Sequence, residues 1–152
     1  MLKFYRVVSL VLILFLFGCG YKPILNSKNY DFSINFENNE GDETINKFII
    51  ERLNYLKDEN KSKTFQISLE STLNKIIISK DSKGDPSIFE SNLITLINVK
   101  NEKRKLFKRK ISKKNTYNNK SDKFELEQYE NILIKNASEN IAEEILSYLS
   151  NL

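Results

Sequence analysis

The sequence predicts an α+β fold, a two-layer sandwich in which a four-stranded, mostly antiparallel sheet packs against two helices in the order β-α-β-β-β-α. Two kinds of periodicity predict this class. Four segments alternate apolar and polar residues, as half-buried strands do, and two segments repeat apolar residues at three- and four-residue spacing, as amphipathic helices do. The apolar stripes of both helices need a cover, which one twisted sheet provides.

The first strand and the first helix are separated by a short polar break. Residues 30–36 alternate apolar and polar side chains, which predicts a strand with one buried face. Residues 38–42, which include Gly41, interrupt this pattern. Apolar side chains then return with helical spacing at Ile45, Phe48, Ile49, Leu53 and Leu56. This spacing predicts an amphipathic helix over residues 43–56.

Three further strands are predicted between residues 65 and 117. Alternation over residues 65–78 predicts a long strand, with a bulge near Asn74 and Lys75 where the phase of the pattern slips. Turn-forming residues fill 81–86, and strand-like sequence follows over 88–99 and over 105–117. Because short turns join antiparallel neighbours, these three strands are expected to form a meander.

The last helix is predicted from Asp122 to the end of the chain. Asp122 and Glu125 suit the positive end of the helix dipole and form a variant of the capping box. The predicted apolar stripe is Tyr129, Leu133, Ala137, Ile141, Ile145 and Leu149, reinforced by Leu126, Ile132, Leu146 and Tyr148. All these elements are assigned to one domain, residues 30–152.

Residues 1–18 have the features of a bacterial lipoprotein signal peptide. Lys3 and Arg6 precede an apolar run over residues 7–17, about half the length that a membrane-spanning helix needs. The segment Leu16-Phe17-Gly18-Cys19 resembles the lipobox, although Phe17 is bulkier than the usual residue there. Cys19 is the only cysteine and has no disulfide partner in the chain, so its expected use is lipidation; the alternative is a buried free cysteine.

Residues 19–29 are expected to form a lipidated tether between the membrane and the domain. An N-terminal lipid with two or three acyl chains, palmitate among them, holds a protein stably on a membrane. In many Gram-negative bacteria, an aspartate directly after the cysteine retains the lipoprotein in the inner membrane. Gly20 occupies that position. The expected location is therefore the periplasmic face of the outer membrane.

The sequence lacks the usual components of a catalytic site. It contains no histidine, its one cysteine is assigned to lipid, and no phosphate-binding glycine loop, metal-ligand cluster or nucleophile elbow occurs in it. Paired carboxylates such as Glu127 and Glu130 could serve a glycosidase, but their places on the polar side of a predicted helix favour solvation. We therefore expect no enzymatic activity, no cofactor and no metal.

Basic residues gather in one part of the chain. The whole sequence has 24 Lys and Arg against 20 Asp and Glu, yet residues 98–120 contain ten basic residues and one acid, Glu102. Such a window suits contact with anions. The alternative is a solvated face in a lysine-rich chain. Nucleic acid is not expected as a partner, because an envelope protein meets phosphate mainly as phospholipid headgroups and lipid A.

The residues after the predicted cleavage site carry a family resemblance. The opening Cys19-Gly20-Tyr21-Lys22-Pro23-Ile24-Leu25, followed by a β-α-β-β-β-α domain of this size, resembles short alphaproteobacterial-type members of the LPS-assembly lipoprotein LptE family. The resemblance implies an outer-membrane lipoprotein that plugs and assists assembly of the LptD barrel and binds lipopolysaccharide during its delivery to the cell surface. The competing prediction is a non-catalytic structural or accessory lipoprotein of outer-membrane protein assembly.

The resemblance implies three partners: an LptD-like β-barrel, lipopolysaccharide, and the membrane through the N-terminal lipid. Lys and Arg are the residues that pair with the phosphates of a glycolipid. We place this contact on the hairpin between the last two predicted strands. The candidate residues are Lys103, Arg104, Lys105, Lys108, Arg109 and Lys110. No family motif surrounds them, so they are assigned on their charge.

Overall fold

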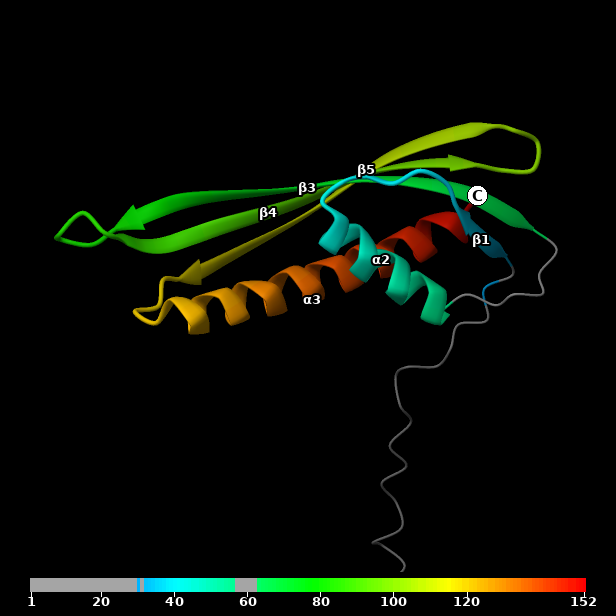
Figure 1. Cartoon of the computed structure of the whole chain (residues 1–152). Coiled ribbons are helices and arrows are strands. Elements are labelled where there is room, and N and C mark those ends of the chain that lie inside the picture. Colours follow the sequence, from blue (N-terminus) through cyan, green and yellow to red (C-terminus); the bar gives the residue numbers. More distant parts are fainter. Residues whose placement is uncertain (1–29, 31, 57–62) are drawn as a thin grey trace, which may run out of the picture.

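The computed structural model describes residues 30, 32–56 and 63–152. Within these residues, five strands form one sheet, and two helices lie against the same face of it (Figure 1). The predicted α+β class and the two predicted helices are confirmed. The predicted signal peptide, the tether and Cys19 lie outside the described residues.

The observed elements follow the predicted order with one addition. They are β1 (Ser33–Phe36), β2 (Glu40–Gly41), α2 (Glu43–Leu56), β3 (Thr64–Lys80), β4 (Pro86–Lys100), β5 (Leu106–Asn118) and α3 (Lys123–Leu149). Helix α2 has the predicted bounds, and each end of the three long strands lies within two residues of its prediction. Strand β1 begins at Ser33 rather than Tyr30, and the two-residue β2 was not predicted.

The sheet is mixed and has five strands, so it agrees broadly with the expected four-stranded, mostly antiparallel sheet and differs from it in detail. Strands β3, β4 and β5 form the predicted antiparallel meander. Both β1 and β2 run parallel to β3, with Ser33 opposite Thr64 and Gly41 opposite Ser71. The chain crosses from β1 to β3 through α2, and such a crossover connects parallel strands. The strand order is β1-β3-β4-β5, with β2 also on the outer edge of β3.

The predicted bulge near Asn74 and Lys75 is wrong. These residues stay in register with Asn92 and Ser91, and the register shifts occur after Ile77 and after Ser79, beside the turn. The side chain of Lys75 forms an ion pair with Glu130 of α3. An ion pair therefore occupies a position on the helix-covered face that the apolar alternation would have given to a hydrophobic residue.

The hydrophobic core lies between the helices and one face of the sheet. Fully buried members are Ile45, Ile49 and Leu53 of α2, Ile67 and Leu69 of β3, Leu93, Ile97 and Val99 of β4, and Ile141, Ile145 and Leu146 of α3. The opposite face, which we call the open face, has no helix over it (Figure 1). It is the face to which alternate residues of β5, such as Lys108 and Lys110, belong by register.

The N-terminal half of α3 departs from the predicted apolar stripe. Buried residues recur at helical spacing from Ala137 to Leu149, where α3 also packs beside α2. Tyr129 and Ile132, which were predicted to belong to the buried stripe, are 36% and 56% exposed. The reason is that α2 accompanies only the C-terminal half of α3, so fewer surfaces cover the other half (Figure 1). Neither helix in the described residues is long and apolar enough to cross a membrane.

The two ends of the long sheet differ. The tether end contains the starts of β1 and β3, the β4–β5 turn and the last residue, Leu152, which lies near Lys63 and Asn101. The distal end contains the β3–β4 turn and the start of α3 (Figure 1). Five apolar side chains that are about half-exposed or more lie toward the distal end: Ile76, Ile77, Ile78, Phe124 and Ile132. We call these five the distal apolar residues. Tyr55 and Leu106 are comparably exposed elsewhere.

Candidate anion-binding surface

Acidic partners divide the basic window into two groups. Five of its cations are in ion pairs: Lys100 with Glu37, Arg109 and Lys113 with Glu144, Lys114 with Glu90, and Lys120 with Glu125. The other five, Lys103, Arg104, Lys105, Lys108 and Lys110, form no ion pair with any other described residue. These five are also exposed, so their charges are available to an anion.

Three of these cations lie in the β4–β5 turn at the tether end. The backbone N–H of Arg104 donates to the carbonyl of Asn101 at 2.8 Å, and the Asn101 side chain accepts from the N–H of Lys105 at 3.0 Å. Arg104 has a φ of 56°, in the left-handed region that favours glycine. The turn thus presents Lys103, Arg104 and Lys105 side by side on a tight, hydrogen-bonded loop. We call these three residues the basic turn.

Lys108 and Lys110 lie on the open face of β5. They face the same side, about 7 Å apart along the strand, because residues i and i+2 share a face. Their neighbours across the sheet on β4 are Asn98 and the 40% exposed Leu96. The pair therefore continues the basic turn onto a broad surface that no helix covers.

Arg109 lies on the other side of the sheet, apart from the five other candidate residues. Its guanidinium lies 4.8 Å from the ring centroid of Tyr148, and its Nη2 is 3.4 Å from Oε1 of Glu144. Both partners belong to α3. Arg109 thus joins β5 to the helix layer, and it shares Glu144 with Lys113, whose Nζ donates to Oε2 at 2.9 Å.

The two cations give Glu144 a perturbed titration. The hydrogen bond from Lys113 is the main cause that holds the pKa of this carboxyl below its ordinary value of 4.5, and Arg109 adds to the effect. Burial acts in the opposite direction, as it raises the pKa of a carboxyl. A depressed pKa in the folded state means that the ionised carboxylate stabilises the fold.

The variant Glu144→Gln is expected to have a lower free energy of unfolding at neutral pH. This free energy should also depend less on pH in the acid range than that of the wild type. In the wild type, the contribution of Glu144 is complete above pH 4.5 and is lost as the pH falls through its lower folded pKa. The wild-type urea midpoint should therefore fall more steeply below pH 4.5 than that of Glu144→Gln. The exposed Glu127 of the same helix provides the control as Glu127→Gln. Parallel curves for wild type and Glu144→Gln would contradict this assignment.

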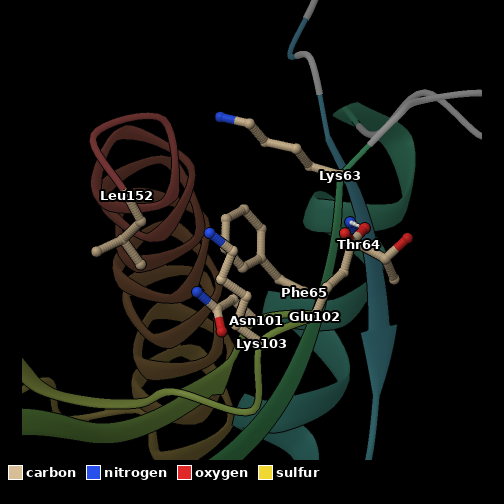
Figure 2. A pocket seen from close by; sticks show the side chains of 7 residues that line it. All are labelled: Lys63, Thr64, Phe65, Asn101, Glu102, Lys103 and Leu152. Carbon is tan, nitrogen blue, oxygen red and sulfur yellow. Dashed lines mark hydrogen bonds between the residues drawn. The ribbon is translucent and has the colours of Figure 1, made fainter.

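A small cavity opens beside the basic turn. Its volume is about 230 Å³, and it is lined by Lys63, Thr64, Phe65, Asn101, Glu102, Lys103 and Leu152 (Figure 2). Glu102 accepts a hydrogen bond from the backbone N–H of Thr64 at 3.0 Å, which ties the turn to the start of β3. The cavity is amphipathic, since two ammonium groups border the Phe65 ring and the Leu152 side chain (Figure 2).

Sequence reasoning missed one residue of this surface, Lys63, and included one that lies on the other side of the sheet, Arg109. Lys63 lies 40 positions before Lys103 in the sequence, and only the β3–β4–β5 meander brings both to the same cavity. Arg109 could have been separated from its neighbours, because it alternates in phase with Phe107 and Ile111, and Ile111 is buried. In the described residues, no three acidic, histidine or cysteine side chains come together as a metal site.

A second polar cluster joins the distal half of the sheet to α3. Glu130 accepts hydrogen bonds from Lys75 and, at 2.9 Å, from the hydroxyl of Tyr117. Lys75 also lies over the Phe89 ring, 4.3 Å from its centroid. Burial, followed by the bond to Glu130, raises the pKa of Tyr117 above its ordinary value of 10.0. The cluster is filled by its own members, which indicates a structural role.

The fold and this surface define the class of the protein as a small α+β domain with one helix-covered sheet face and one open face. Solved structures of the same fold are bacterial lipoproteins. The rare lipoprotein B from Shewanella oneidensis matches with a TM-score of 0.62 and 17% identity, over 78% of this chain and 94% of that chain. A minor lipoprotein from Acinetobacter baumannii matches with a TM-score of 0.59 and 12% identity, over 80% and 92%.

A third solved structure, lipoprotein B from Nitrosomonas europaea, matches with a TM-score of 0.55 and 13% identity, over 81% of this chain and 87% of that chain. No family model and no curated protein sequence matches the chain. At these identities, the matches establish a shared fold. The sheet with two helices on one face is therefore a fold that bacterial lipoproteins use.

Proposed function

We propose that the protein is a lipoprotein anchored through Cys19 at the periplasmic face of the outer membrane, where it plugs and assists assembly of an LptD-like barrel and binds lipopolysaccharide during its delivery. The observation that carries this proposal is the coincidence of two independent features. The fold is shared with solved bacterial lipoproteins, and the sequence places a lipobox-like segment before Cys19.

The distal apolar residues support the part of the proposal that concerns a protein partner. Ile76, Ile77 and Ile78 are 53%, 47% and 49% exposed, although each is a large aliphatic side chain. Exposed apolar side chains that gather on one region mark surfaces that another molecule covers. They also lie beyond Ser71, the last residue of β3 that β2 pairs with. A barrel wall that surrounds the distal end would shield them from water.

The distal isoleucines give a test of barrel capture. Ile76→Lys combined with Ile78→Lys is expected to reduce recovery of the LptD-like barrel, because two charges would have to be desolvated in the complex. The measurement is affinity purification of the lipidated protein from detergent-solubilised envelopes of its own bacterium, with mass spectrometry of the captured barrel. Recovery should fall by roughly ten-fold or more, the equivalent of about 1.4 kcal/mol.

Leu106→Lys is the matched control for this experiment. Leu106 is 49% exposed, as is Ile78, but it lies at the tether end. This variant should retain the barrel. Capture of other barrel-assembly components without an LptD-like protein would overturn the proposal and favour an accessory lipoprotein of outer-membrane protein assembly.

The five cations that form no ion pair with another described residue support the lipopolysaccharide part of the proposal. Lys103, Arg104, Lys105, Lys108 and Lys110 offer donors that match the phosphates of lipid A. Arg109 is kept out of the tested set, since its substitution would break the contacts with Glu144 and Tyr148. Three of the five lie in the basic turn, and the other two lie on the open face of β5, which follows it.

Changing these five residues to glutamine is expected to weaken lipopolysaccharide binding and to flatten its dependence on salt. Each lost charge removes a screened attraction to phosphate, so the slope of affinity against ionic strength should decrease. Binding is measured at several salt concentrations with purified lipopolysaccharide. Lys80→Gln with Lys83→Gln, near the distal turn, provides the control. Equal affinity and equal slope for the five-fold variant and wild type would refute the contact.

A further inference from the structure

The basic turn lies at the end of the molecule to which the N-terminal tether connects. The backbone N–H of Ser33, the first residue of β1, donates to the carbonyl of Lys63 at 2.8 Å. The backbone N–H of Thr64, the residue after Lys63, donates to the side chain of Glu102 in the turn. Lys63 and Lys103 then line the same cavity (Figure 2). The point where the chain enters the fold is therefore adjacent to Lys63 and the basic turn.

The tether sets how far this end can lie from the bilayer. Residues 19–29 span at most about 40 Å when fully extended. The 17 residues of β3 carry the β3–β4 turn a further ~55 Å away from the tether end. Once Cys19 is acylated, the tether thus limits the distance of the tether end from the lipid headgroups, while the distal turn can lie farther away.

The charges of the two ends also differ. Around the tether end, Lys63 and the basic turn supply four cations, while Glu102 is engaged by the backbone of Thr64. In the distal turn, two lysines are balanced by Asp81 and Asp85. Among the described residues, the tether end therefore has an excess of positive charge that the distal turn lacks. This excess complements an anionic lipid surface, where each cation near the surface adds to the attraction.

A comparison of the two hairpin turns supports a role for the charge of Arg104. The β3–β4 turn has the same backbone hydrogen bonds, from Gly84 N–H to the Asp81 carbonyl at 3.1 Å and from Asp81 N–H to the Asp85 carbonyl at 2.8 Å. Glycine occupies its left-handed position, with a φ of 88°. Arginine occupies the corresponding position of the β4–β5 turn, although a side chain is disfavoured there. The basic side chain is thus retained where glycine would fit better.

We propose that Lys63 and the basic turn dock onto the phosphates of anionic phospholipids in the same leaflet that holds the lipid anchor. This inference rests on the acylation of Cys19 and not on capture of a barrel, and it shares the basic turn with the proposed lipopolysaccharide contact. The docking keeps the tether end at the headgroups of that leaflet. Leu106 and Leu152, both partly exposed at this end, lie beside the contact.

The experiment uses the lipidated full-length mature protein in vesicles without lipopolysaccharide. Because the thiol of Cys19 is blocked by the anchor, Leu106→Cys and Ser82→Cys each introduce a single labelling site, at the tether end and at the distal end. Energy transfer from the label to a headgroup acceptor is compared between vesicles of phosphatidylcholine alone and vesicles containing phosphatidylglycerol. For the Leu106 site, transfer should rise roughly two-fold with the anionic lipid and fall again at high salt. The Ser82 site should not respond.

Three variants decide between docking and a general charge effect. Changing Lys63 and the three residues of the basic turn to glutamine should abolish the response, while Lys80→Gln with Lys83→Gln should leave it intact. Arg104→Gly should weaken the response yet raise the urea midpoint, since glycine relieves the left-handed conformation. A response that is absent in the wild type, or lost equally in the Lys80 and Lys83 variant, would overturn the proposal. Loss of barrel capture with this response intact would instead contradict the proposed function.

Discussion

Replacing Gly41 with alanine is expected to lower the free energy of unfolding by about 3 kcal/mol. Gly41 has a φ of 82°, which costs an L-residue with a side chain about 1 to 2 kcal/mol. A Cβ added there would lie 2.1 Å from the carbonyl oxygen of Ser71, so the backbone of β3 would have to move. That carbonyl also accepts the N–H of Asp42 at 2.8 Å.

The cost is large because several elements meet at Gly41. Asp42, which follows it, caps α2 by accepting the N–H of Ile45 at 3.1 Å. Asn46 of the same helix donates to the carbonyl of Glu40 at 2.7 Å. Ser71 is buried and shares a hydrogen bond with Thr95 of β4. A displacement at Gly41 therefore disturbs β2, the start of α2 and the centre of β3 together.

Gly84→Ala is the matched control. Gly84 has a similar φ of 88°, but no atom lies within 4 Å of the position that its Cβ would take. This variant should cost only the backbone conformation, about 1 kcal/mol. Urea unfolding followed by circular dichroism measures both variants. Equal losses of stability would show that contact with Ser71 contributes nothing.

Gly20→Asp is expected to move nearly all of the protein from the outer to the inner membrane. Aspartate after the acylated cysteine is the retention signal in many Gram-negative bacteria, and the substitution lies in the tether, outside the domain. The fold and its urea midpoint should therefore remain unchanged. Separation of the two membranes on a density gradient, followed by immunoblotting, gives the distribution.

Two further variants control the localisation experiment. Gly20→Ser should leave the protein in the outer membrane, because serine is not the retention signal. Cys19→Ser should prevent palmitate labelling and leave the precursor unprocessed, since the lipidated thiol is absent. A wild-type protein found in the inner membrane, or a Gly20→Asp variant that stays in the outer membrane, would contradict the predicted localisation.

Periodicity predicted where the helices and strands lie better than it predicted which strands pair and in which direction. Helix α2 and the three long strands were located to within two residues because each buries one face in a regular pattern. The parallel pairing of β1 was missed, since alternation identifies a buried face and contains no information on strand direction. Strand β2 has two residues, too few for any period to be recognised.

The wrongly predicted bulge near Asn74 and Lys75 has two causes. The triplet from Ile76 to Ile78 resembled a slip of the strand's phase, but the register continues through Ile77 and all three residues are about half-exposed. Ile76 belongs by alternation to the open face, which no helix covers. Lys75 remains on the inner face because Glu130 neutralises it. Such a partner lies 55 positions away in the sequence and cannot be read from local pattern.

The sequence predicted which cations concentrate in the candidate surface, but only part of their arrangement in space. The concentration of cations between residues 98 and 120 was visible in the sequence, as was the hairpin that presents them. The strand period could have placed Arg109 on the side opposite Lys108 and Lys110. The proximity of Lys63 depends on the register of β3 with β4, which the sequence leaves open.

The unbroken path of β3 and β4 makes the sheet a lever. Both strands run from the tether end to the distal turn, and paired strands resist bending within their plane. Over ~55 Å of strand, a tilt of about 10° at one end displaces the other by about 10 Å. A small change in the tilt of the tether end therefore produces a large displacement of the distal turn.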